Sequence, residues 1–361
     1  MRRSGKELPL SPFPSVTHYT LALNSQLIAP PAYDDTYGYF PIDFDRIVAY
    51  DLNLGKQLWL VSAKPLWAPA AGGGFLYIYQ TDGLTAYRAS DGSIAWTTPF
   101  AQKPVVAPLW DHGWLVVVTA SEVFAFRDRD GGLVWQQAIA GVRATPSIDA
   151  DRIYLSLDHG RVLGLRLDTG AQIWEQKLGG DPNAILARGD RLFVGSTDNF
   201  LYCLKTEDGS KDWRVRTGAD IVSKPIAERN RVYFVSLDNV LRAVNHSNGV
   251  QLWKKPLPFR PAWPPLKVAD TVVVAGLAGS ARAFFVKDGL AAGELAIDAA
   301  SEIAAPFHAF GSASALGPMV IAVTNSFAEG AAVMAVSRTI DPPIAPLAPF
   351  PGIIPVTVPK P

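Results

Sequence analysis

The sequence predicts an all-β protein, an eight-bladed β-propeller made of four-stranded antiparallel blades. Three observations support this: a repeat of about forty residues, a hairpin signal in the copies, and an unpaired first strand that complements an incomplete last copy. Four short extended segments in about forty residues are typical of one propeller blade. We expect the propeller over residues 16–340, an N-terminal extension over residues 1–15 and a proline-rich tail over residues 341–361.

A tryptophan marks the repeat and follows a glycine by four residues in each complete copy. The six markers, separated by 37, 39, 39, 39 and 40 residues, are Trp59, Trp96, Trp135, Trp174, Trp213 and Trp253. A seventh copy has the turn glycine, Gly289, but carries Gly293 in the tryptophan slot. Such regular spacing predicts that the six indoles have a structural role that is repeated around the ring.

A small residue stands six positions before each turn glycine. The series is Ala49, Ala86, Ala125, Gly164, Cys203, Ala243 and Ala283. Cys203, the only cysteine, falls in this series, so we interpret it as a buried small side chain and not as a catalytic thiol. A single cysteine excludes an intramolecular disulfide and a paired-cysteine redox centre.

Tight turns join the central strands of the units, most clearly in the segment from Arg191 to Trp213. The turn dipeptides include Asp82-Gly83, His159-Gly160, Asp198-Asn199 and Asp238-Asn239. Glycine and asparagine tolerate the positive φ that such turns need, so the aspartates are assigned to turn chemistry and not to catalysis. An earlier segment of each unit carries a proline, at Pro30, Pro69, Pro108, Pro146, Pro225, Pro265 and Pro306, and the fifth unit has Ile185 there.

The last copy, residues 300–338, ends before its fourth strand. The alternating segment from Val16 to Leu23 precedes the first full unit and has no partner there. We expect this segment to complete the last blade, because closure of the ring removes exposed strand edges. Beyond Ile340 the tail contains eight prolines, which predict an extended segment.

These units resemble the PQQ-like β-propeller repeat. The resemblance is carried by Asp168-Thr169-Gly170 with Trp174, Val194-Gly195-Ser196 with Asp198, and Leu201-Tyr202, and extends over residues 16–338. In that family the tryptophan packs between adjacent blades. In length and blade number the chain is most similar to BamB-type outer-membrane assembly propellers, so the resemblance implies a non-enzymatic scaffold of the cell envelope or periplasm with unidentified protein partners.

Two other functions stay open at this point. The repeat also occurs in PQQ-dependent sugar and alcohol dehydrogenases, which hold the quinone against a disulfide between neighbouring cysteines, with a calcium beside a catalytic aspartate. Cys203 alone cannot form that disulfide. The other alternative is a ligand-binding sensor domain. We expect no enzymatic activity, no cofactor and no catalytic residue.

Charge and composition limit the partners. Equal numbers of acidic and basic residues argue against a broad nucleic-acid surface. No two of the five histidines have metal-ligand spacing, which predicts that there is no metal site. The sequence contains no transmembrane run, secretion signal or lipoprotein box, so the compartment stays open. We expect a monomeric propeller.

The remaining candidate site is the mouth of the central channel. Trp67 and Trp263 stand two residues before the proline slot in their units, and basic residues lie on or just before the innermost strands, at Lys64, Lys103, Arg143, Lys224 and Arg260. These residues predict an aromatic-rimmed, mildly basic funnel that could hold an anionic or peptidic ligand, although the same pattern fits ordinary solvated rim residues.

Overall fold

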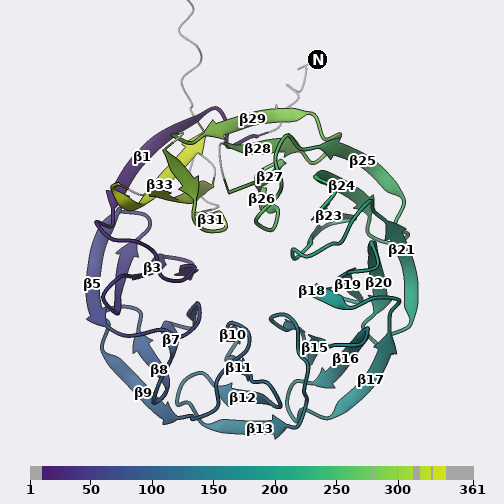
Figure 1. Ribbon diagram of the computed structural model, residues 1–361, viewed down its shortest axis with the longest axis horizontal. Helices are drawn as coiled ribbons and strands as arrows, with labels where there is room; N and C mark the ends of the chain where they lie inside the picture. Colours follow the sequence, from purple (N-terminus) through teal and green to yellow (C-terminus); the bar gives the residue numbers. More distant parts are fainter. Residues whose placement is uncertain (1–9, 278–279, 299, 312–317, 327, 339–361) are drawn as a thin grey trace, which may run out of the picture.

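The computed structural model describes residues 10–338 apart from 278–279, 299, 312–317 and 327. Every regular element in these residues is a β-strand, and the strands form eight sheets arranged radially around a central axis (Figure 1). The eight-bladed all-β prediction is therefore confirmed. Residues 1–9 of the expected extension and the tail over residues 341–361 lie outside the described residues.

Blades 1 to 7 each contain four strands that are consecutive in the chain. The strands of blades 1 to 4 are β2 (Ala32–Tyr33), β3 (Tyr37–Ile42), β4 (Arg46–Asp51), β5 (Lys56–Ser62), β6 (Ala70–Gly72), β7 (Phe75–Gln80), β8 (Gly83–Arg88), β9 (Ile94–Pro99), β10 (Leu109–Asp111), β11 (Trp114–Val118), β12 (Val123–Arg127), β13 (Leu133–Gln137), β14 (Ser147–Asp149), β15 (Arg152–Ser156), β16 (Arg161–Arg166) and β17 (Gln172–Lys177). Those of blades 5 to 7 are β18 (Pro182–Arg188), β19 (Arg191–Ser196), β20 (Phe200–Lys205), β21 (Lys211–Arg216), β22 (Ile226–Glu228), β23 (Arg231–Ser236), β24 (Val240–Asn245), β25 (Gln251–Pro256), β26 (Leu266–Val268), β27 (Thr271–Ala275), β28 (Ser280–Phe285) and β29 (Ala291–Ala296).

Blade 8 joins the two ends of the propeller. Its strands are β30 (Ser301–Ile303), β31 (His308–Phe310), β32 (Met319–Ser326), β33 (Gly330–Arg338) and β1 (Ser15–Ala22). β1 pairs antiparallel with β33 from Ser15↔Arg338 to Ala22↔Ala332. The predicted completion of the last blade by the N-terminal strand is confirmed.

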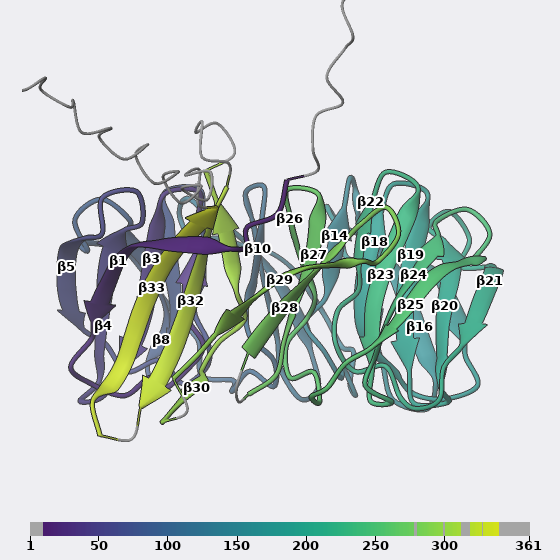
Figure 2. The ribbon, with the colours of Figure 1, turned by 90° about the horizontal axis from the view of Figure 1, so that it is seen from above.

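The antiparallel order gives the ring two different faces (Figure 2). We call the face where the chain enters each innermost strand the entry face; it also carries the hairpins between second and third strands. The exit face carries the hairpins between first and second strands and the turns between third and fourth strands. Loops on the same face come from all blades, so residues far apart in sequence can share a surface.

The indoles of the six marker tryptophans tie each blade to the next. Each indole N–H donates to a backbone carbonyl three residues before the next turn glycine, at 2.6–3.1 Å. The acceptors are the carbonyls of Ala89, Asp128, Leu167, Thr206, His246 and Val286. Each ring also lies against that glycine; a Cβ on Gly92 would stand 2.8 Å from the Trp59 ring. A large ring with one polar N–H suits such a contact.

The predicted small residues lie opposite the tryptophans. Ala49 pairs with Trp59, and Cys203 pairs with Trp213 on the neighbouring strand of its own blade. Cys203 is fully buried, and burial raises the pKa of its thiol to about 12. A thiol held neutral in this way is a poor nucleophile, which agrees with a packing role.

Tyr19 takes the tryptophan role where the ring closes. It pairs with Ala335, and the register skips one residue beside it, as it does beside the tryptophans. The Tyr19 hydroxyl donates to the Leu52 carbonyl at 2.6 Å, and its ring lies 2.8 Å from where a Cβ on Gly55 would be. Leu52 stands three residues before Gly55, so blade 8 holds blade 1 by the same contact.

Phe13 fills the place of the tryptophan that blade 7 lacks. The third and fourth strands of blade 8 are not consecutive in the chain, so no turn between them offers a glycine for an indole. Phe13 stands just before β1 and is 3% exposed. It packs directly against Gly293, because a Cβ added to Gly293 would lie only 2.6 Å from the Cβ of Phe13. Ser11 Oγ donates to the Ala292 carbonyl at 2.6 Å and fixes the segment.

We predict that the closing contact depends on the Tyr19 ring and hydroxyl. Tyr19→Phe removes only the hydrogen bond and should lower the free energy of unfolding by about 1 kcal/mol. Tyr19→Ala also removes the ring and should cost about 3 kcal/mol. Tyr19→Trp restores the residue of the other blades and should stay close to the wild type in denaturant unfolding. A Tyr19→Ala protein as stable as the wild type would contradict this role.

We also predict that Phe13 is needed to seal blades 7 and 8. Phe13→Ala opens a cavity in a buried cluster and should lower the free energy of unfolding by about 3 kcal/mol. Leu10→Ala, in the same segment but 46% exposed, serves as the control and should change stability little. Equal effects of the two substitutions in urea unfolding would show that Phe13 does not seal the interface.

Candidate functional site

The entry loops present mostly small residues just before the innermost strands. The residues directly before the proline slots are Ala29, Ala68, Ala107, Thr145, Ala184, Lys224, Pro264 and Ala305. Lys224 is the one charged member. The Lys224 residue is exposed to solvent, yet neighbouring protein partly desolvates its ammonium and lowers the pKa, while the charge of Asp111 in blade 3 opposes the shift.

The other predicted cations are spread around the ring. Arg143 forms ion pairs with Asp158 at 3.1 Å and Asp181 at 3.3 Å, and Lys64 lies 3.6 Å from Asp45. Lys103 and Arg260 are exposed and form no ion pair with a described residue. The structure therefore places the five cations in or next to blades 2, 3, 4, 6 and 7 and does not bring them together.

The two predicted rim tryptophans lie half-buried in blades 2 and 7, with blades 1 and 8 between them. The Trp67 indole N–H donates to the Pro104 carbonyl at 2.8 Å and its ring packs on the cluster between blades 2 and 3. Trp263 packs on the cluster between blades 7 and 8, and its indole nitrogen is buried without a described partner. Trp67 thus links neighbouring blades, and the funnel that these tryptophans would border stays a prediction.

Asp238 shows how the turn aspartates on the entry face are used. Its carboxylate accepts from Arg242 at 2.5 Å and from the Gly218 N–H at 2.9 Å. Burial alone would raise the pKa of Asp238, but the hydrogen bonds of Arg242, Ser236 and Gly218 outweigh burial and lower it to about 2. An aspartate bound in this way holds the loop and is not a proton acceptor at neutral pH.

Phe44 is an unusual residue on the entry face, and its position was not predicted. It stands in the three-residue turn between β3 and β4, is 85% exposed and has φ of 65°. Bulky residues rarely take positive φ, and asparagine or glycine is the ordinary choice. The guanidinium of Arg46 lies 5.3 Å from the ring centroid. The sequence does contain a signal, because a phenylalanine occupies a turn where neighbouring copies carry glycine or asparagine.

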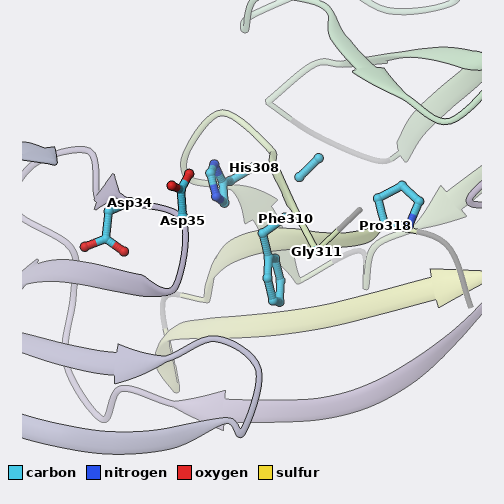
Figure 3. A pocket seen from close by; sticks show the side chains of 7 residues that line it. Asp34, Asp35, His308, Phe310, Gly311 and Pro318 are labelled. Atoms are coloured by element: carbon cyan, nitrogen blue, oxygen red, sulfur yellow. The ribbon is translucent and has the colours of Figure 1, made fainter. Parts of the chain in front are cut away.

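Two hollows lie on the exit face on either side of the loop that holds Asp34 and Asp35. The first, of about 540 Å³, is lined by Asp34, Asp35, His308, Ala309, Phe310, Gly311 and Pro318 (Figure 3). The second, of about 370 Å³, is lined by Asp34, Asp35, Thr36, Tyr37, Ala71, Gly72, Gly73, Gly74, Ala89 and Trp110. Both volumes fall within the usual range of ligand pockets.

Two residues of the first hollow, His308 and Phe310, belong to a stack of three rings. Tyr33 and His308 lie parallel with centroids 4.3 Å apart, and His308 and Phe310 lie parallel at 6.4 Å. Burial lowers the pKa of His308 to about 4, against the opposing charges of Asp34 and Asp35. His308 is therefore neutral at pH 7, and its Nε2 is buried without a described partner.

The residues present do not fit a quinone site of the dehydrogenase type. Cys203 is the only cysteine and is buried opposite Trp213, inside a blade. Within residues 10–338, leaving out the gaps, no three His, Cys, Asp or Glu side chains gather as a metal would need. In the same part of the chain no helix is long and apolar enough to cross a membrane.

Comparison with protein families identifies the chain. Residues 43–185 and 177–338 match the family described as outer membrane protein assembly factor BamB. The chain belongs to this BamB family. Comparison with curated proteins gives no match.

Solved structures agree with the BamB-family fold. BamB from Moraxella catarrhalis is 18% identical with a TM-score of 0.71, over 91% of this chain and 99% of that one. Sqt1 from Saccharomyces cerevisiae is 10% identical with a TM-score of 0.73, over 88% and 98%. Quinohemoprotein alcohol dehydrogenase from Comamonas testosteroni is 13% identical with a TM-score of 0.67, over 91% and 77%. At these identities the likeness shows the fold alone.

Proposed function

We propose that this chain is a non-enzymatic protein-interaction platform of the bacterial cell envelope and takes part in outer-membrane protein assembly. Membership of the BamB family supports the cell-envelope setting and the assembly role. The ring supports the platform role, because its blades are fixed to one another and its loops are free to carry contacts.

The observation that carries the proposal is the exposed Phe44 turn. Two more exposed aliphatic side chains lie in the entry-face segments before the first strands of blades 1 and 2, Ile28 (44% exposed) and Leu66 (36% exposed). A strained turn that holds an aromatic ring in water costs stability, so the ring calls for a role outside the fold. Aromatic anchors surrounded by aliphatic residues are typical of the centre of a protein interface.

A PQQ-dependent dehydrogenase is the main alternative, because the quinohemoprotein enzyme shares this fold. The proposed platform should bind no quinone after incubation with PQQ and calcium, and it should not oxidise alcohols or sugars with an artificial electron acceptor. Absorbance spectra after gel filtration and dye-linked assays measure both. One quinone retained per protein molecule after gel filtration, or dye reduction faster than in an assay without the protein, would overturn the platform role.

A ligand-binding sensor domain is a further candidate, favoured by Lys224. This ammonium is the one charge among the residues directly before the proline slots, a setting suited to one anionic group. Such a role would need no contact through Phe44, so it is separable from the platform function.

We predict that Phe44→Asn separates stability from binding. Asparagine relieves the positive φ, so the variant should unfold at a higher temperature, with a gain of up to about 1 kcal/mol. The tagged variant should capture several-fold less of its envelope partners from detergent extracts of the native organism, measured by quantitative mass spectrometry.

The control for this experiment is Leu54→Asn, which removes a 72% exposed side chain on the exit face of the same blade. It should leave capture unchanged. Capture that is unaffected by Phe44→Asn, or lowered equally by both substitutions, would contradict a platform that works through the Phe44 turn.

A further inference from the structure

The two hollows on the exit face lie on the opposite side of the ring from Phe44 and have no role in the proposed function. They share the lining residues Asp34 and Asp35, so the two hollows lie side by side, one toward blade 8 and the other toward blades 2 and 3. We call this pair of hollows the exit groove. Over blade 2 the hairpin is Gly72-Gly73-Gly74, which has no side chains to fill the second hollow; a Cβ on Gly74 would meet no atom within 4 Å.

Among the described residues that line the exit groove, Asp34 and Asp35 are negatively charged, and none is a lysine or an arginine. Asp34 is used by the fold, since its carboxylate accepts from the N–H groups of Thr36 and Tyr37 and from the Tyr39 hydroxyl at 2.7–2.8 Å. Asp35 is exposed and makes no hydrogen bond or ion pair with another described residue. The groove thus offers one available carboxylate at its centre.

Apolar and aromatic surfaces lie on both sides of that carboxylate. On one side is the half-buried, neutral His308, with Phe310 beside it only 6% exposed, and on the other is the half-buried Trp110, whose indole N–H bonds Asp128 at 2.9 Å and whose ring lies against Gly72. A neutral imidazole keeps one acceptor nitrogen, which suits an N–H donor. An occupant that fills both hollows must therefore be apolar at two points and cationic between them.

We propose that the exit groove binds an extended, basic peptide segment of a partner protein, with a lysine or arginine at Asp35 and flanking apolar side chains in the two hollows. An extended chain places alternate side chains on one side, which suits two hollows around a central charge. The complementary charge sets the register and specificity of the contact. This goes beyond the proposed function, since it adds a second site on the opposite face from Phe44.

The test uses the purified full-length chain and a phage library of random twelve-residue peptides. Selection is run on the wild type with soluble Asp35→Lys protein as competitor, and enriched peptides are then labelled with fluorescein and titrated by anisotropy. We expect enriched peptides in which a lysine or arginine is flanked by apolar residues. Asp35→Lys should weaken their binding about tenfold or more, and added salt should weaken it as well.

Two further variants separate the groove from general charge effects. Asp151→Lys makes the same change in the corresponding hairpin of blade 4, where the side chain is 69% exposed, and should change affinity less than about twofold. Gly74→Asn adds a side chain in the groove at a residue with φ of 84°, which asparagine tolerates, and should weaken binding several-fold. No enrichment over the competitor, selection of acidic peptides, or equal effects of Asp35→Lys and Asp151→Lys would overturn the proposal, whatever the outcome at Phe44.

Discussion

The structure depends on one contact, in which an aromatic side chain of the outermost strand lies on the turn of the next blade and donates a hydrogen bond to its backbone. Each blade is a small sheet that cannot bury both faces alone, and packing against its neighbours makes the core continuous. For example, Trp59, Ile47 and Tyr39 of blade 1 share a buried cluster with Leu76 and Ile78 of blade 2. The aromatic contact fixes the angle at which such faces meet.

Closure of the ring replaces tryptophan at two places, and both replacements come from the N-terminal segment. Tyr19 holds blade 1 through the Leu52 carbonyl, and Phe13 fills the space beside Gly293. The missing tryptophan of blade 7 is thus a consequence of how blade 8 is assembled. Because β1 is far in sequence from β33, the last interface forms only when both ends of the chain meet, which makes closure the step with the highest loop entropy.

The repeat itself was predictable, because Trp spacing, turn glycines and small residues at fixed offsets are local features of sequence. Tyr19 could also have been found, since Ala335 extends the small-residue series and requires an aromatic partner. Phe13 could not, because its proline-rich surroundings gave no strand pattern. The exit groove and the separation of Trp67 from Trp263 depend on which loops become neighbours around the ring, and no local pattern carries that information.

The same rigid ring leaves the two faces free to differ, with a strained, exposed Phe44 on one and an acidic, aromatic groove around Asp35 on the other. The ring depends most directly on the six indole contacts. Hydrogen exchange of the indole N–H groups, followed by NMR of protein labelled with ¹⁵N-tryptophan, measures them individually. All six should exchange slowly and at similar rates, far more slowly than Trp114, whose indole has no hydrogen bond to a described acceptor. Rates as fast as that of Trp114, or scattered over several orders of magnitude, would contradict a common contact around the ring.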